Sequence, residues 1–265
     1  MMQSTNPALQ ADRFGGWRNT PGLSLAPAAR ANVMTVSGTV NAALILTGLL
    51  VASGVATASL AWSHPQIALG AALVSLAATL VVGIALFFRP LWAPVLAPIY
   101  AVCEGALLGL FSAYASQAMQ GTKIGGASGS GVVVAASVLT LGTLAMMLLA
   151  YKARLVRATP LFQKVMLIGT ASVCLFVLAT WILSIVGVNM SVVWGGGPIA
   201  ILITLALIVY GAFMFIMDFD LIERRAAEGA PKAMEWYGAY ALLVTVVFLY
   251  IQFLRLLIQI FGRKN

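Results

Sequence analysis

The chain has 265 residues, of which 62% are hydrophobic and only 8% are charged, and its mean hydropathy is +1.01. A soluble domain carries roughly 25% charged residues, so this composition excludes an ordinary soluble protein and indicates an all-α integral membrane protein. The net charge of +8 comes from basic residues in short segments between apolar runs, which is typical of orientation against a membrane and not of nucleic-acid binding.

The first 33 residues are polar and carry Arg13, Arg18 and Arg30. They lack the short apolar core and small-residue cleavage site of a signal peptide. We therefore expect a flexible cytoplasmic tail over residues 1–33 and a transmembrane domain over residues 34–262.

Seven apolar runs reach the length of about 20 residues that a membrane-spanning helix needs. They cover residues 34–60, 67–88, 94–117, 132–151, 163–187, 196–222 and 234–261. Basic residues concentrate in alternate connecting segments, chiefly the tail, Lys152–Lys164 and Arg224–Lys232. The positive-inside rule then predicts a cytoplasmic amino terminus. Seven spans would put the carboxyl terminus outside, where Arg263 and Lys264 fit poorly, so its side stays open.

Glu104 lies near the middle of the third span. Charged residues inside a span are expensive and usually face the interior of the bundle. Two interpretations are open: a hydrogen-bonded carboxyl that fixes helix contacts, and a group in an ion or proton path.

The sixth span ends in the sequence FIMDFDLIERR, which contains two aspartates. Asp218 and Asp220 are two residues apart and therefore point in nearly opposite directions on a helix. Asp220 stands four residues before Arg224, the spacing of an exposed ion pair. Asp218 shares its face with Gly211 and is expected to point into the bundle, where Arg89, at the end of the second span, lies at similar depth. Asp218 is therefore the functional candidate and Asp220 a secondary one.

The seventh span carries a polar stripe on one helical face, formed by Thr245, Gln252, Arg255 and Gln259. Such a stripe must meet partners or water and not lipid. We therefore predict a seven-helix bundle with a central seventh helix, although polar adhesion between helices alone would also explain the stripe.

Signatures of catalysis and of metal binding are weak in this sequence. The GASG segment at residues 126–129 matches an intramembrane serine protease pattern, but the single histidine, His64, lies in a distant loop. Cys103 and Cys174 both lie inside apolar runs, and one histidine without clustered cysteines argues against a transition-metal site. We predict neither an enzyme nor a bound cofactor.

Several segments resemble the transmembrane Bax inhibitor motif family. They are EGALLG in the third span, MDFDLIE at the end of the sixth, and GAPKAMEWYGAY and FLYIQFLRLLIQIFG in the seventh; two of them look like the bacterial Bax inhibitor/YccA-like branch. The resemblance implies six helices around a seventh, in a bacterial inner membrane. It also implies pH-sensitive calcium leak, or a role in stress survival through modulation of a membrane protease.

The resemblance also implies roles for single residues. The family's sixth-helix aspartate falls on Asp218 and the arginine that can latch it falls on Arg89. Its seventh-helix aspartate falls on Gln252, which is a departure, because a two-carboxylate sensor needs two acids that share a proton. Either Glu104 or Glu235 supplies the second carboxylate, or the sensor is weaker or missing.

Three functions are therefore expected as alternatives. The first is a cation leak pathway for calcium, in which Asp218 coordinates the transported ion or gates it and Glu104, Gln252 and backbone carbonyls contribute oxygen ligands. The second is a non-conducting regulator that binds a membrane protease or another membrane protein. The third is a proton-coupled transporter. The oligomeric state is left open.

Overall fold

The computed structural model describes residues 32–119, 129–153, 155 and 158–262. Seven long helices in this part of the chain are apolar enough to cross a membrane, which confirms the predicted all-α seven-span fold. They are α3 (Val36–Ser63), α4 (Pro65–Phe88), α5 (Ala93–Ala118), α6 (Ser130–Lys152), α7 (Pro160–Ile185), α9 (Pro198–Ala227) and α10 (Met234–Phe261). Two short elements, η2 (Pro90–Trp92) and α8 (Ser191–Trp194), lie between them. Most of the predicted tail and of the GASG segment falls outside the described residues.

Prolines mark where several of these helices begin. Pro65, Pro160 and Pro198 each stand in the first turn of a helix, where the N–H that proline lacks is not needed. At α7 the preceding Thr159 also caps the helix, because its Oγ1 accepts a hydrogen bond from the N–H of Phe162 at 3.2 Å. Each of these three helices, α4, α7 and α9, therefore begins directly after the turn that precedes it.

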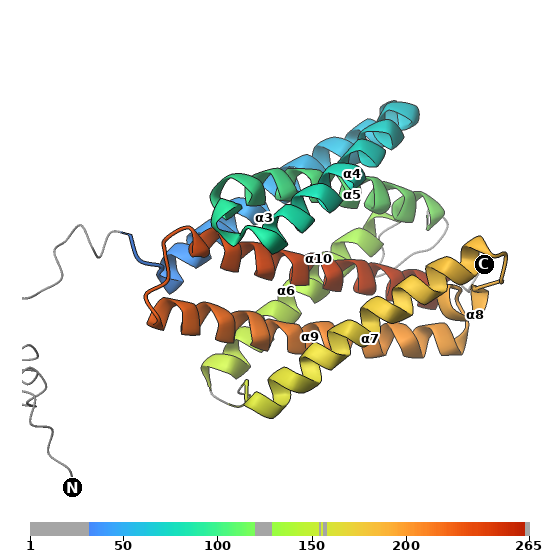
Figure 1. Cartoon of the computed structure of the whole chain (residues 1–265). Coiled ribbons are helices and arrows are strands. Elements are labelled where there is room, and N and C mark those ends of the chain that lie inside the picture. Colours follow the sequence, from blue (N-terminus) through green and yellow to red (C-terminus); the bar gives the residue numbers. More distant parts are fainter. Residues whose placement is uncertain (1–31, 120–128, 154, 156–157, 263–265) are drawn as a thin grey trace, which may run out of the picture. The chain divides into compact units, whose positions relative to one another are not determined.

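The central helix of the bundle is α10. It packs against α3, α5, α6 and α9, and Figure 1 shows it lying between the group formed by α3, α4 and α5 on one side and α9 on the other. Its buried side chains include Leu243, Leu249 and Leu257. The predicted central position of the seventh helix is confirmed.

Glycines allow α3 and α5 to pack closely. A Cβ atom on Gly109 would collide with the backbone carbonyl of Gly54, and one on Gly105 would collide with Leu50 and Ser53. In lipid the hydrophobic effect does not drive helices together, so their association depends on close packing. Small residues favour it because they let the two backbones approach.

At the edge of the bundle, α7 has α9 as its main neighbour. The rings of Phe162 and Phe213 meet edge to face at 6.0 Å, and the hydroxyls of Thr170 and Tyr210 are hydrogen-bonded at 2.6 Å. Within α7 only Met166 and Thr180 are buried, so most of this helix is left to face lipid.

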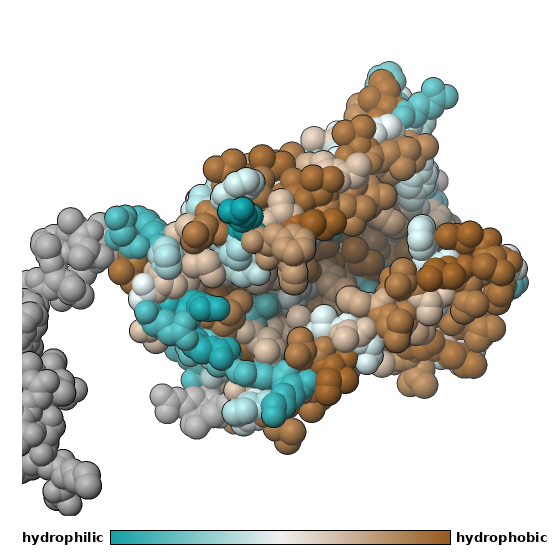
Figure 2. Space-filling view, viewed as in Figure 1, coloured by the Kyte–Doolittle hydropathy of each residue, from teal (hydrophilic) through white to brown (hydrophobic). Residues whose placement is uncertain are grey.

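The surface separates into apolar sides and a strongly hydrophilic end (Figure 2). That end, which we call the charged end, carries the last turns of α9, where Glu223, Arg224, Arg225 and Glu228 are all exposed. The end of the bundle where α8 lies is called the α8 end. Figure 1 shows α9 running from the α8 end to the charged end and α10 running back.

Candidate functional site

Polar and small residues line the contact between α9 and α10, which we call the α9–α10 seam. On α9 they are Thr204, Gly211 and Asp218, and on α10 they are Thr245, Gln252 and Gln259, all of them buried. Each set repeats every seven residues, so each set lies along one face of its helix. The polar stripe that the sequence shows on α10 thus faces a second stripe, of small and polar residues, on α9.

Two hydrogen bonds fix the register of the seam. Thr245 Oγ1 donates to Asp218 Oδ2 at 2.6 Å, and Thr204 Oγ1 donates to Gln259 Oε1 at 3.0 Å. Two heptads separate the bonded residues on each helix, which corresponds to about 21 Å at 1.5 Å per residue. The seam therefore extends through most of a hydrocarbon core of about 30 Å.

Asp218 forms the layer of the seam nearest the charged end. Its side chain is 7% exposed, and the hydroxyl of Thr245 is its hydrogen-bond partner. No Lys or Arg among the described residues lies within ion-pair distance of it. A buried carboxylate without a cation is costly, which marks Asp218 as the candidate functional group of the seam.

Gln252 lies midway along the seam on α10, at the level of Gly211 on α9. It is 8% exposed, and its Oε1 atom is buried without a hydrogen-bond partner in the described part of the chain. A Cβ atom on Gly211 would stand 2.9 Å from both Leu249 and Phe248, so glycine lets α9 approach α10 closely here. The middle layer therefore holds an amide oxygen that accepts no hydrogen bond from the described residues.

The third layer of the seam, at Thr204 and Gln259, contacts residues 190–197, which contain α8 and which we call the α8 loop. Gln259 Nε2 donates to the carbonyl oxygen of Gly195 at 3.0 Å, and Arg255 Nη2 donates to that of Val193 at 2.6 Å. The Arg255 guanidinium also lies over the ring of Trp194, 4.3 Å from its centroid. Two polar side chains of α10 thus hold the loop at this end of the seam.

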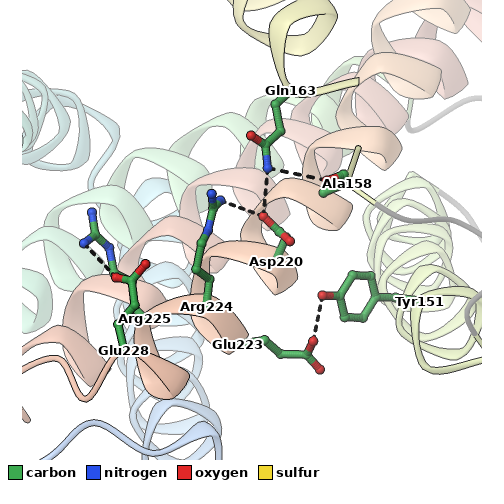
Figure 3. A network of polar contacts seen from close by, with 8 residues as sticks. All are labelled: Tyr151, Ala158, Gln163, Asp220, Glu223, Arg224, Arg225 and Glu228. Atoms are coloured by element: carbon green, nitrogen blue, oxygen red, sulfur yellow. Dashed lines mark hydrogen bonds and ion pairs between the residues drawn. The ribbon is translucent and has the colours of Figure 1, made fainter. Parts of the chain in front are cut away.

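A separate polar network surrounds Asp220 at the charged end (Figure 3). Asp220 Oδ2 accepts hydrogen bonds from Arg224 Nη2 at 2.6 Å and from Gln163 Nε2 at 3.1 Å, which tie α9 to the start of α7. Tyr151 donates to Glu223 Oε2 at 2.8 Å and so ties α9 to the end of α6. The predicted pair between Asp220 and Arg224 is present, and Asp220 belongs to this network and not to the seam.

A family model described as Bax inhibitor 1 like matches residues 3–262. The chain belongs to the Bax inhibitor 1 like family. No curated protein and no solved structure gave a significant match. The YccA-like branch stays a prediction.

Of the residues that the family resemblance singled out, Asp218 and Gln252 lie in the seam and Arg89 does not. Arg89 is exposed and stands 5.9 Å from the ring centroid of Trp92. No ion pair joins it to Asp218 in the described structure, so the latch expected between them is not formed. The physical reason is packing: the elements that flank Arg89, α4 and η2, pack against α3, α5 and α10, whereas Asp218 lies on α9.

Glu104 and Glu235 also lie apart from Asp218. Glu104 is half-buried on α5, close to the rings of Tyr100 and Tyr240, and no hydrogen bond or ion pair within the described residues joins it to the seam. Neither residue therefore supplies, in this structure, the second carboxylate beside Asp218 that a two-carboxylate sensor needs.

Glu235 instead caps the start of α3. Its Oε1 accepts hydrogen bonds from the backbone N–H of Thr35 at 2.9 Å and from its hydroxyl at 2.8 Å. Thr35 Oγ1 accepts in turn from the N–H of Gly38 at 3.0 Å, and a Cβ atom on Gly38 would collide with the Glu235 carboxylate. A negative charge at a helix amino terminus is favourable. The Glu235 carboxylate, which belongs to α10, therefore stabilises the start of α3 and joins the two helices. The contact spans 200 residues, and no local sequence signal indicates it.

Metal binding has only limited support from the geometry. In the described ranges no three His, Cys, Asp or Glu side chains come together. Calcium takes six to eight oxygen ligands, whereas the layer around Asp218 offers one carboxylate and the Thr245 hydroxyl. This layer therefore lacks the ligand set of a permanently bound calcium ion.

Proposed function

We propose that the chain mediates a pH-modulated cation leak along the α9–α10 seam, with calcium as the leading ion and Asp218 as the gate. The observation that carries this proposal is the buried Asp218 carboxylate, which has a hydroxyl partner but no compensating cation in the described structure. The polar layers at Gln252 and Gln259 extend from it toward the α8 end.

The proposed gate works through the charge of one side chain. An ionised Asp218 attracts a cation into the seam, where Coulomb attraction is stronger than in water. The Gln252 amide oxygen is the next hard ligand along α10. Protonation of Asp218 removes the negative charge, so we expect cation entry to fall as the carboxyl is protonated.

Asp218→Asn tests the gate. Purified protein in vesicles loaded with a calcium-sensitive dye should show calcium flux that decreases toward acidic pH. Asp218→Asn should reduce this flux by roughly tenfold or more, the change that a barrier about 1.4 kcal/mol higher would give, and should remove its pH dependence. Asp220→Asn is the matched control, because it makes the same chemical change two residues away on the same helix, outside the seam. Equal flux from Asp218→Asn and from the unaltered protein would contradict the assignment.

The alternative, a non-conducting regulator of a membrane protease or of another partner in stress response, has a distinct outcome in the same vesicles. Flux would then match that of protein-free vesicles, while deletion of residues 1–30 would abolish the cellular phenotype. Neither alternative assigns the chain a catalytic activity. For both we propose location in a bacterial inner membrane, on the basis of the resemblance to the bacterial branch of the family, with the amino terminus in the cytoplasm, on the basis of the basic segments.

A further inference from the structure

A cavity of about 270 Å³ lies between α3, α5, α6 and α10, away from the α9–α10 seam. Its floor is formed by buried residues of α5 and α10, such as Leu108 and Val247. Its rims are formed by α3 and α6, where Val51, Val55 and Leu141 line the cavity and are 53%, 65% and 54% exposed. The cavity therefore opens sideways, between α3 and α6.

The lining of this cavity offers almost nothing to a polar ligand. Each lining hydroxyl on α3 and α6 already donates to a carbonyl of its own helix, as in Ser137 to Val133 at 2.9 Å and Thr140 to Ala136 at 2.8 Å. The remaining pair, Ser112 and Tyr250, is hydrogen-bonded at 2.7 Å. A water molecule needs two to four polar partners, and apolar cavities stay dry. The occupant must therefore be apolar.

The position of the cavity identifies the source of an apolar occupant. The lining residues lie in the middle part of membrane-spanning helices, as at Val246 and Val247 within α10 (Met234–Phe261). Because Val51, Val55 and Leu141 belong both to the cavity and to the apolar outer surface, the cavity is continuous with the interface between protein and lipid. An engineered apolar cavity of roughly 150 Å³ holds a benzene molecule, so this larger one has room for several carbons of a chain.

We propose that this cavity binds one acyl chain of a bilayer phospholipid, inserted between α3 and α6 against α5 and α10. The chain fills a space that would otherwise be a void beside the central helix. The headgroup stays at the membrane surface, which is consistent with a lining that offers no charged side chain.

The test uses a phosphatidylcholine that carries a photoreactive diazirine near the middle of one acyl chain. The full chain is reconstituted with this lipid, irradiated and analysed by peptide mass spectrometry. We expect adducts concentrated on the lining segments of α3 and α6. Ser137→Phe should lower these adducts by roughly tenfold, equivalent to about 1.4 kcal/mol of binding free energy. Val138→Phe, on the next and 64% exposed residue of α6, adds the same ring toward lipid and should leave them unchanged.

Adducts spread evenly over all exposed apolar helix faces, or lining adducts that Ser137→Phe leaves intact, would overturn the proposal. If Ser137→Phe elutes as an aggregate in size-exclusion chromatography, Ser137→Leu replaces it, since its smaller side chain still enters the cavity. A diazirine fatty acid without a headgroup forms the second arm. Stronger labelling of the lining by this free acid than by the phospholipid would overturn the phospholipid as the source.

Discussion

At the scale of single residues, the two buried glutamines of α10 are a natural comparison. Gln252 and Gln259 lie on the same helical face and are 8% and 4% exposed. Gln259 bonds to Thr204 and to Gly195, whereas the Oε1 of Gln252 has no partner in the described structure. A buried polar group without a partner destabilises the fold by about 1–3 kcal/mol, so replacing it with an apolar group of similar shape can be neutral or stabilising.

We therefore expect opposite effects on stability from the same substitution at these two positions. Gln252→Met should leave the free energy of unfolding unchanged or raise it by about 1 kcal/mol, because it removes an unpaired amide oxygen. Gln259→Met should lower it by about 1–3 kcal/mol, because the Gly195 carbonyl loses its donor and the Thr204 hydroxyl keeps only its bond to the Ala200 carbonyl. Thermal unfolding in the same detergent measures both. Equal destabilisation would mean that Gln252 is satisfied by a bound group.

At the scale of elements, the seven spans could be predicted from the sequence because each is an apolar run of sufficient length. The end of α9 could not be predicted in this way. The apolar run stops at Glu223 and Arg224, whereas the helix continues to Ala227. The polar stripe of α10 was visible as Thr245, Gln252, Arg255 and Gln259 among apolar neighbours. Its counterpart on α9 was not, because threonine and glycine do not stand out in an apolar span.

The α8 loop was also beyond sequence reasoning, because the groups that hold it are backbone carbonyls. Arg255→Met should free the loop, since it removes the donor to the Val193 carbonyl and the stacking on Trp194 while keeping the length of the side chain. We expect the amides of residues 190–197 to exchange hydrogen roughly tenfold faster, because a hydrogen bond from a charged group contributes about 1.5–3 kcal/mol. Hydrogen exchange with mass spectrometry measures this.

Arg224→Met is the matched control for Arg255→Met. It also removes an arginine with a 2.6 Å hydrogen bond, but that bond joins Asp220 at the charged end. Exchange in the α8 loop should be the same as in the unaltered protein. Acceleration by both variants to the same extent would indicate general loosening of the bundle and would contradict a local latch.

At the scale of the whole molecule, the structure has two chemically different ends. The charged end carries exposed Arg224 and Arg225 and the ion pairs around them, whereas the α8 end is held together by hydrogen bonds to loop carbonyls. Basic residues favour the cytoplasmic side, so the charged end should face the cytoplasm. The proposed leak would then have Asp218 near its cytoplasmic side and the α8 loop across its outer side.

Single cysteines test this orientation. Cys103 and Cys174 are first replaced by alanine, and a cysteine is then placed at Ser191, the first residue of α8, or at Glu228, at the charged end; both positions are exposed. In intact cells a membrane-impermeant maleimide should modify Ser191→Cys and should reach Glu228→Cys only after the membrane is permeabilised. The reverse pattern would invert the orientation and place Asp218 near the outer surface. Because Ser191 precedes α9 and Glu228 follows it, the two positions lie on opposite sides if α9 spans the membrane once, and they cannot both be modified in intact cells.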